Sequence, residues 1–306
     1  MPRRDARTIM TQYSPSAPDP TSARQLRELF RKHAFRPRRA LGQTFLVDAN
    51  IVGKIIGAAA LTGREPVLEI GAGAGAVTRA LARAAGRVVA VEIDPRLVAI
   101  LRETVGDAAE VVQADVLALD PRRLLGAPEK GRWRVVANLP YAITGPALFS
   151  LTEARGWFDR LVVMVQREVA QRLTAPPGSR ARGMLSVLLQ TFFEVSKVMV
   201  VSRNCFWPRP RVESEILTLV VAHPALVPGS LEASFRQVVR AAFGSRRKTL
   251  ANALSHASEL SLLKEEALAL LDGCHIEPSR RAETLTEGDF LRLAEAYSCR
   301  RQKGRA

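Results

Sequence analysis

The chain has 306 residues, 47% of them hydrophobic and 25% charged, and this ordinary globular composition excludes a wholly disordered protein. It contains no run of about 18 apolar residues, so we expect neither a membrane-spanning helix nor, after the basic first residues, a secretory signal. Lys and Arg number 45 against 30 Asp and Glu, and the net charge of +15 favours a polyanionic partner such as RNA.

Residues 1–36 have the composition of a basic arm. Within them, residues 13–20 are rich in Pro and Ser and are incompatible with a helix. We therefore expect residues 1–36 to be disordered. Met10 is a second candidate start, and an organelle-targeting segment is disfavoured by acidic residues such as Asp5 and Glu28.

From about residue 48 the sequence alternates helices with short apolar runs. Asp48 can cap a helix that extends to Ala60. Strands are expected at residues 67–70, 88–91, 111–113, 134–137 and 161–165, with helices between them that include residues 95–104. Continuous apolar runs separated by helices predict parallel strands that are buried on both faces. The fold class is therefore α/β, with a Rossmann-like doubly wound sheet and helices on both faces.

The pattern changes near His223. Before it we expect a helix near residues 182–194 and two further strands, at 197–202 and 215–221. After it the segments are helical only, at residues 231–242, 247–254, 262–271 and 289–297. We therefore predict a Rossmann-like domain over residues 37–222 and a small all-α domain over residues 223–306, which ends in a basic tail.

A glycine-rich turn at residues 71–75 follows the first expected strand. Glycines allow the backbone to turn there and to approach a ligand closely. Gly71, Gly73 and Ala76 satisfy the dinucleotide fingerprint, and Glu92 lies where an acidic ribose-binding residue is expected. A nicotinamide enzyme is therefore one interpretation of this turn.

Three features favour S-adenosylmethionine over a dinucleotide. The carboxylate of Glu69, directly before the glycines, would repel a pyrophosphate but suits a sulfonium zwitterion. Asp115 follows the third strand and can accept a hydrogen bond from the adenine amine. Asn138 follows the fourth strand and begins a motif that hydride transfer does not need. The carboxyl ends of parallel strands meet at one edge, so these groups should gather at the switch point of the sheet.

The motif Asn138-Leu-Pro-Tyr141 suits chemistry on the exocyclic amine of adenine. This nitrogen must become tetrahedral to accept a methyl group, and two acceptors aimed at its hydrogens favour that geometry. Asn138 can supply its side-chain oxygen and Leu139 its carbonyl, because Pro140 stiffens the turn and donates nothing. Tyr141 offers a ring on which a flipped-out base can stack. Catalysis would consist mainly of positioning for an in-line displacement.

Phe206 and Trp207 form a second aromatic pair, in a loop stiffened by Pro208 and Pro210. They can serve as another wall of the base pocket. The alternative is that this loop packs on the edge of the sheet.

The three cysteines are far apart and the four histidines have no ligand spacing, so we expect no metal site and no disulfide framework. This cysteine usage indicates a reducing compartment, and we expect a cytoplasmic protein. No heptad pattern or large apolar stripe suggests an oligomer, so we expect a monomer.

Taken together, the motifs resemble the ribosomal RNA adenine dimethyltransferase family, in particular its bacterial small-subunit (16S) branch. The similarity covers residues 36–298 and rests on residues 41–46 (LGQTFL), 69–75 (EIGAGAG), 91–94 (VEID), 113–115 (QAD), 138–141 (NLPY), 206–214 (FWPRPRVES), 242–254 (AFGSRRKTLANAL) and 281–285 (RAETL). The resemblance implies dimethylation of two adjacent adenosines near the 3′ end of 16S rRNA in an assembling 30S subunit, with S-adenosylmethionine as cofactor.

The resemblance also implies roles for individual residues. The residues that match the family's cofactor contacts are Thr44, Leu46, Gly71, Gly73, Glu92, Asp115 and Asn138. Glu92 would bind the ribose hydroxyls and Asp115 the adenine amine. Two positions depart from the usual pattern: Thr44 stands where Asn or His is usual, and Ala142 where Asn is common. Thr44 has less reach, so its contact is the one in doubt.

The basic run Arg246, Arg247 and Lys248 is expected to begin a helix and to contact RNA phosphate. The segment Arg246–Leu254 favours the small-subunit branch of the family. The alternative is a related 23S methyltransferase of macrolide resistance, which would share the catalytic residues. A non-catalytic RNA-binding protein on the same scaffold is a third alternative, and the intact motif at residues 138–141 argues against it.

Overall fold

The computed structural model describes residues 18–38, 42–125, 132–140, 143–245 and 247–303. The chain divides into two compact units. The first comprises Met1–Ala170 and Ser196–Val221, and the second comprises Gln171–Val195 and Ala222–Ala306. Among the described residues, no helix is both long and apolar enough to cross a membrane.

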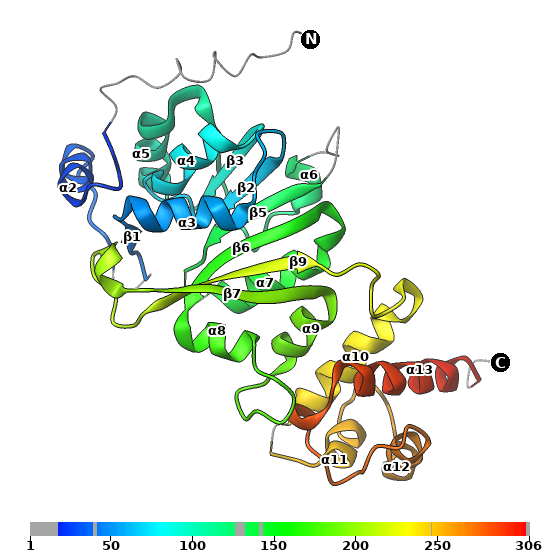
Figure 1. Ribbon diagram of the computed structural model, residues 1–306. Helices are drawn as coiled ribbons and strands as arrows, with labels where there is room; N and C mark the ends of the chain where they lie inside the picture. Colours follow the sequence, from blue (N-terminus) through cyan, green and yellow to red (C-terminus); the bar gives the residue numbers. More distant parts are fainter. Residues whose placement is uncertain (1–17, 39–41, 126–131, 141–142, 246, 304–306) are drawn as a thin grey trace. The chain divides into compact units, whose positions relative to one another are not determined.

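The elements alternate along most of the chain (Figure 1). The strands are β1 (Phe45–Leu46), β2 (Pro66–Ile70), β3 (Arg87–Glu92), β4 (Glu110–Gln113), β5 (Trp133–Asn138), β6 (Phe158–Gln166), β7 (Phe193–Val201), β8 (Phe206–Trp207) and β9 (Ser214–Val221). The helices are α2 (Ala23–Lys32), α3 (Ala49–Ala59), α4 (Ala76–Ala84), α5 (Pro95–Val105), α6 (Pro121–Leu125), α7 (Thr144–Glu153), α8 (Arg167–Leu173), α9 (Met184–Phe192), α10 (Glu232–Phe243), α11 (Leu250–Ser255), α12 (Lys264–Gly273) and α13 (Glu287–Lys303).

Seven strands form the central sheet in the order β4-β3-β2-β5-β6-β9-β7. The pairs β4·β3, β3·β2, β2·β5 and β5·β6 are parallel, as the sequence predicts. The strand expected at residues 215–221, for which the sequence predicted no direction, is β9, and it pairs antiparallel with β6. An apolar strand buried on both faces has the same composition in either direction, so the sequence pattern could not distinguish the two cases.

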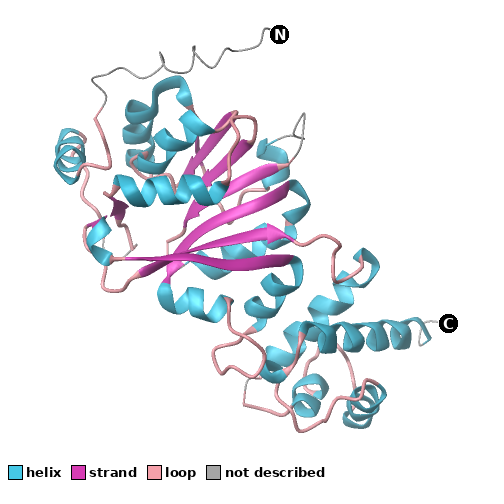
Figure 2. Cartoon of the chain, in the orientation of Figure 1, coloured by secondary structure: helices cyan, strands magenta, loops and turns pink. Residues whose placement is uncertain are grey.

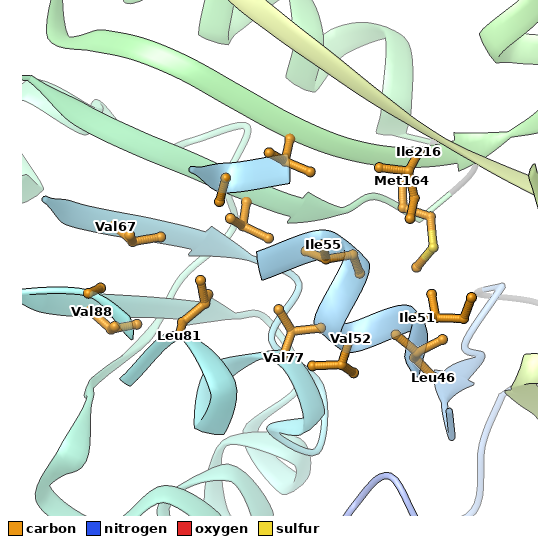
Figure 3. Close-up of a cluster of buried hydrophobic side chains, with 14 of the residues drawn as sticks. Leu46, Ile51, Val52, Ile55, Val67, Val77, Leu81, Val88, Met164 and Ile216 are labelled. Atoms are coloured by element: carbon orange, nitrogen blue, oxygen red, sulfur yellow. The ribbon is translucent and has the colours of Figure 1, made fainter. Parts of the chain in front are cut away.

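Both faces of the sheet are covered. Successive residues of a strand point to opposite faces, and Val135, Val136 and Ala137 of β5 are all buried. On one face, α3 and α4 contribute Ile55, Val77 and other apolar side chains to a cluster with the strands (Figure 3). Figure 2 shows helices packed around the strands of this sheet. The α/β fold class expected from the sequence is thereby confirmed.

The segment before residue 36 differs from its expected disorder. Residues 18–36 are described, and they include helix α2, capped by the Ser22 hydroxyl. Leu26, Leu29 and Phe30 follow helical spacing and are buried in a cluster with Phe45. This apolar stripe, rather than the basic composition, decides the structure of residues 23–32. Residues 1–17 lie outside the described residues.

The second unit contains more of the chain than the residues after 222. Residues 171–195 also belong to it. Arg182 connects this segment to the C-terminal helices, because its buried guanidinium pairs with Glu287 and donates to the side chain of Gln190 at 2.6 Å. The chain passes between the units after Ala170, Val195 and Val221. The single boundary predicted between residues 222 and 223 lies next to the last of these points.

Two helix limits in this unit also differ from expectation. Helix α11 begins at Leu250, so Arg247 and Lys248 lie in the turn that precedes it. Helix α13 continues to Lys303, and Arg300 forms an ion pair with Glu266. The basic residues from 300 to 303 are thus part of a helix and not of a tail.

Candidate active site and cofactor pocket

A cavity of about 350 Å³ lies at the carboxyl ends of the central strands. Because the chain runs outward from β2 to β3 and β4 and then returns to β5, the switch point of the sheet lies between β2 and β5. The polar residues that the sequence analysis expects at this edge, Glu69, Glu92, Asp115 and Asn138, all line the cavity. The topology therefore brings together groups that are up to 69 positions apart in the sequence.

The glycine turn lies against the end of β5. Gly71 has a φ of +76°, and a Cβ atom added there would lie 2.7 Å from the carbonyl oxygen of Asn138. Gly73 has a φ of +57° and faces the ring of Phe45. Only glycine meets both the left-handed conformation and the close approach at position 71. Because the turn contains only glycine and alanine, its backbone borders the cavity.

Glu92, the last residue of β3, is held by the main chain. Its Oε2 accepts the N–H of Gly73 at 2.9 Å, and its Oε1 accepts the N–H groups of Ile93 and Asp94 at 2.9 and 3.0 Å. Burial raises the pKa of Glu92, while these three hydrogen bonds favour the charged form. Since a carboxylate has about four acceptor positions, the fixed side chain can still accept from a ligand hydroxyl.

Glu69 is the most deeply buried acidic group of the cavity. It is 3% exposed, and its Oε2 has no hydrogen-bond partner within the described residues. Burial, together with the nearby carboxylate of Glu92, raises the pKa of Glu69 from 4.5 to about 8, against the opposing effect of the Thr78 hydroxyl. A ligand that donates a hydrogen bond or carries positive charge would satisfy this oxygen.

Asp115 and Ile93 lie at the outer part of the cavity. Asp115 is exposed beyond the end of β4, and its Oδ1 accepts the N–H of Leu117 at 2.9 Å. Ile93 is 59% exposed although it is large and apolar. An exposed apolar side chain and a carboxylate in the lining of one cavity suit a purine ring that has an amine at its edge. Ile93 was not predictable from the sequence, because one apolar residue after a strand carries no distinct signal.

Asn138 is the last residue of β5 and is paired in register with Met164 of β6. The N–H of Leu139 donates to the Met164 carbonyl at 3.3 Å, which continues the strand pairing for one residue. The Pro140 carbonyl accepts the N–H of Ile143 and the hydroxyl of Thr144, so the motif leads directly into α7. Asn138, Leu139 and Pro140 all line the cavity, whereas Tyr141 and Ala142 lie outside the described residues.

Thr44 and Leu46 also line the cavity, as the resemblance implies. Gln43 lines it too and connects two segments: its Oε1 accepts the N–H of Arg38 at 2.9 Å, and its Nε2 donates to Asp94 at 3.3 Å. The sequence analysis did not predict this role for Gln43, although it lies in the motif at residues 41–46.

Phe206 and Trp207 are not placed as a wall of this cavity. They form β8, which pairs antiparallel with β1. Phe206 is buried in the core cluster, and the Trp207 ring centroid lies 5.8 Å from that of Phe30. Phe206 is therefore enclosed in the core, where an apolar ring is more stable than against solvent.

Basic residues are exposed at one turn of the second unit. Arg247 and Lys248 are exposed between α10 and α11, and Arg246 lies outside the described residues. The N–H of Leu250 donates to the Arg280 carbonyl at 2.7 Å, which brings the loop that contains the exposed Arg281 beside this turn. The described residues contain no group of three or more His, Cys, Asp or Glu that could hold a metal ion.

The sequence matches a known family over most of its length. The family model described as "Ribosomal RNA adenine dimethylase" matches residues 34–298. The chain belongs to the ribosomal RNA adenine dimethylase family. The protein named "Ribosomal RNA small subunit methyltransferase A" from Geobacter metallireducens is 42% identical over 268 residues, which are 87% of this chain and 97% of the relative. The protein of the same name from Pelotomaculum thermopropionicum is 44% identical over 281 residues, 89% of this chain and 95% of the relative.

Two solved structures of similar proteins align with most of this chain. A dimethyladenosine transferase from Plasmodium falciparum has a TM-score of 0.71 and 27% identity, with 85% of this chain and 98% of that chain covered. The 23S rRNA methyltransferase ErmE has a TM-score of 0.63 and 28% identity, with 83% of this chain and 99% of that chain covered. The Rossmann-like class I methyltransferase fold is thus shared with both.

S-adenosylmethionine is the cofactor of the dimethylase family, and the cavity suits it. The glycine turn provides a surface that any Cβ atom at Gly71 would disrupt. The partnerless buried oxygen of Glu69 favours a donor or a positive charge, which the ammonium and sulfonium groups supply. Glu92 offers an acceptor for ribose hydroxyls, and Asp115 offers one for the adenine amine.

Proposed function

We propose that this enzyme transfers methyl groups to the exocyclic amines (N6) of two adjacent adenosines near the 3′ end of 16S rRNA, two to each. The bound cofactor supplies an electrophilic methyl group on a sulfonium centre. The observation that carries the proposal is the position of Asn138, at the end of β5 and against the glycine turn that borders the cavity.

Asn138 and Leu139 would hold the adenine amine. In the first transfer, the side-chain oxygen of Asn138 and the main-chain carbonyl of Leu139 would each accept one hydrogen of that amine, which turns its lone pair toward the methyl donor. In the second transfer, the monomethylated amine has one hydrogen left for these acceptors. In each transfer the N–C bond would form as the S–C bond breaks, S-adenosylhomocysteine would leave, and one proton of the amine would pass to water. No strong base is needed, because the reaction depends on orientation. The pairing of Leu139 with Met164 and the two hydrogen bonds to the Pro140 carbonyl fix the backbone that carries these acceptors.

Tyr141 would stack on the flipped-out base in this proposal, beside the residues that hold its amine. Stacking is tolerant of the identity of the base, whereas the two acceptors select an exocyclic amine. The combination would select a base that carries an exocyclic amine.

The RNA would be held partly by the basic turn of the second unit. Arg247 and Lys248 are exposed there, and Arg281 lies in the adjoining loop, so three cations from two loops face solvent near one another. Arginine binds phosphate oxygens in bidentate fashion, and such contacts position an RNA without reading its sequence. The preceding Arg246 belongs to the same proposed surface.

The substrate would be the 30S subunit during its assembly in the cytoplasm, and the enzyme would act as a monomer. A 23S rRNA adenine methyltransferase is the alternative, since ErmE has a similar fold. The higher identity to proteins named small-subunit methyltransferases, at 42% and 44%, supports the 16S assignment.

The test uses the purified protein, labelled S-adenosylmethionine, and 30S and 50S particles from a strain that lacks both modifications. Label should appear on two adjacent adenosines of the 16S rRNA, and mass spectrometry should find dimethyladenosine there. Label that appears only in 23S rRNA would establish the alternative. Particles that remain unlabelled, while a reference enzyme labels them, would refute both assignments.

Asn138→Ala tests the proposed mechanism. Methyl transfer should fall by at least about 100-fold because one acceptor of the amine is lost, while affinity for S-adenosylhomocysteine should change less than about fivefold. Asn50→Ala is a matched control, since Asn50 is exposed on α3. Normal turnover of Asn138→Ala would contradict the role of Asn138.

A further inference from the structure

A segment that precedes the family match lines the cofactor pocket. The family model begins at residue 34, but Pro20 is buried and belongs to the lining of the cavity. We call residues 18–22 the N-terminal strap. Its position was not predictable from the sequence, where the prolines indicated only the absence of a helix.

The strap is held in one conformation by hydrogen bonds. The Pro18 carbonyl accepts from Nη1 of Arg79 at 2.6 Å, and Arg79 belongs to α4, the helix that follows the glycine turn. The N–H of Thr21 donates to the Asp19 carboxylate at 3.0 Å, and the N–H of Asp19 itself donates to the Gln25 side chain at 2.7 Å. Such a strap needs little further ordering when a ligand binds, so its contacts cost little entropy.

Helix α2 fixes the strap to the same unit. Lys32 and His33, at its end, contact the carboxylate of Glu103 on α5 at 2.7 and 2.8 Å. The Phe30 ring packs edge-on against that of Phe45, with 4.8 Å between centroids, and Phe45 in turn faces Gly73 of the glycine turn. The helix thus packs on the residues that border the cavity, which gives the strap a rigid support.

We propose that the N-terminal strap is a wall of the S-adenosylmethionine pocket, and that Pro20 contributes apolar contact to the bound cofactor and slows its release. The inference rests on the proposed function, since it takes the ligand of this cavity to be the methyl donor and its demethylated product. The strap then determines how long the product stays bound after each of the successive methyl transfers.

Two truncations of the full-length protein separate the strap from the residues before it. Deletion of residues 1–21 removes Pro20 and the rest of the strap before Ser22, and it keeps α2 with its Ser22 cap. Deletion of residues 1–17 keeps the strap and is the matched control. Calorimetry and stopped-flow displacement measure the affinity and the release rate of S-adenosylhomocysteine. Loss of an apolar wall should weaken binding on the order of fivefold to tenfold in the longer deletion, mainly through faster release.

A substitution provides an independent test should the longer deletion not fold. Pro20→Gly removes the ring, and Pro228→Gly, at an exposed proline of the second unit, is its control. Weaker binding in Pro20→Gly, with the melting temperature of the ligand-free protein unchanged, would support the strap. Equal affinities in the full-length protein, Pro20→Gly and any folded deletion would overturn it. Absence of S-adenosylhomocysteine binding by the full-length protein would instead refute the proposed function, and the inference with it.

Discussion

Replacing Gly71 with Ala tests the contact on which the catalytic geometry depends. A Cβ atom there would lie 2.7 Å from the Asn138 carbonyl oxygen, closer than such atoms approach without movement, and the neighbour is main chain. The φ of +76° also places an alanine in the left-handed region. The substitution therefore combines backbone strain with displacement of Asn138, the residue proposed to hold the adenine amine.

The two effects can be given magnitudes. Left-handed backbone costs an alanine about 1–2 kcal/mol, and an overpacked buried contact costs about 1–3 kcal/mol. We therefore expect Gly71→Ala to lose roughly 2–5 kcal/mol of unfolding free energy. Relaxation of the clash would move Asn138, and methyl transfer should then fall even at a saturating cofactor concentration.

Chemical denaturation measures the first effect, and methyl transfer to 30S particles measures the second. Gly57→Ala is a matched control of opposite sign: Gly57 is in α3, and a Cβ atom there would have no neighbour within 4 Å. Alanine is the better helix former by about 1 kcal/mol, so this control should be as stable as the unchanged protein or more so. A Gly71→Ala protein of normal stability and activity would refute the close contact.

Three further predictions concern charged groups. Because Glu69 has a folded pKa of about 8 against 4.5, the folded state retains a proton that the unfolded chain loses, so stability falls as pH rises between these values. Glu69→Gln should lose less stability between pH 5 and pH 8 in denaturant titrations, and parallel curves would contradict the raised pKa. Glu92→Ala should weaken S-adenosylhomocysteine binding at least about tenfold by calorimetry, because hydrogen bonds to a charged acceptor are lost. The control Glu110→Ala, at an exposed residue, should not change the affinity. Unchanged affinity in Glu92→Ala would remove Glu92 from the ribose site. Replacing Arg247 and Lys248 with Ala should reduce the salt slope of RNA binding by about 1.5, and an unaltered slope would place the RNA surface elsewhere.

The strands and their polar ends were predictable because local patterns determine them. The apolar runs before Glu92 and Asn138 require burial on two faces, and the rule for parallel sheets places the ends of such strands at one edge. Hence the acidic and amide groups at these strand ends, Glu69, Glu92, Asp115 and Asn138, could be named from sequence alone. The conformation of Gly71 followed from the need for a tight turn.

Long-range packing accounts for what was not predicted. The apolar stripe of the helix at residues 23–32 is visible in the sequence, but the packing of Phe30 against Phe45, which buries that stripe, is not. Phe206 is in the core because β8 pairs with β1, two strands of two residues each. The contribution of Pro20 to the cavity depends on its placement beside α4, and the direction of β9 depends on its partner β6.

The most direct test of the account is a crystal structure of the enzyme with S-adenosylhomocysteine and a substrate adenosine, whose N6 amine still carries both of its hydrogens. The account predicts the glycine turn around the homocysteine part, and the substrate N6 at about 3 Å from both the Asn138 side-chain oxygen and the Leu139 carbonyl. A substrate adenine whose N6 lies out of hydrogen-bonding reach of Asn138, with S-adenosylhomocysteine seated in the cavity, would contradict it.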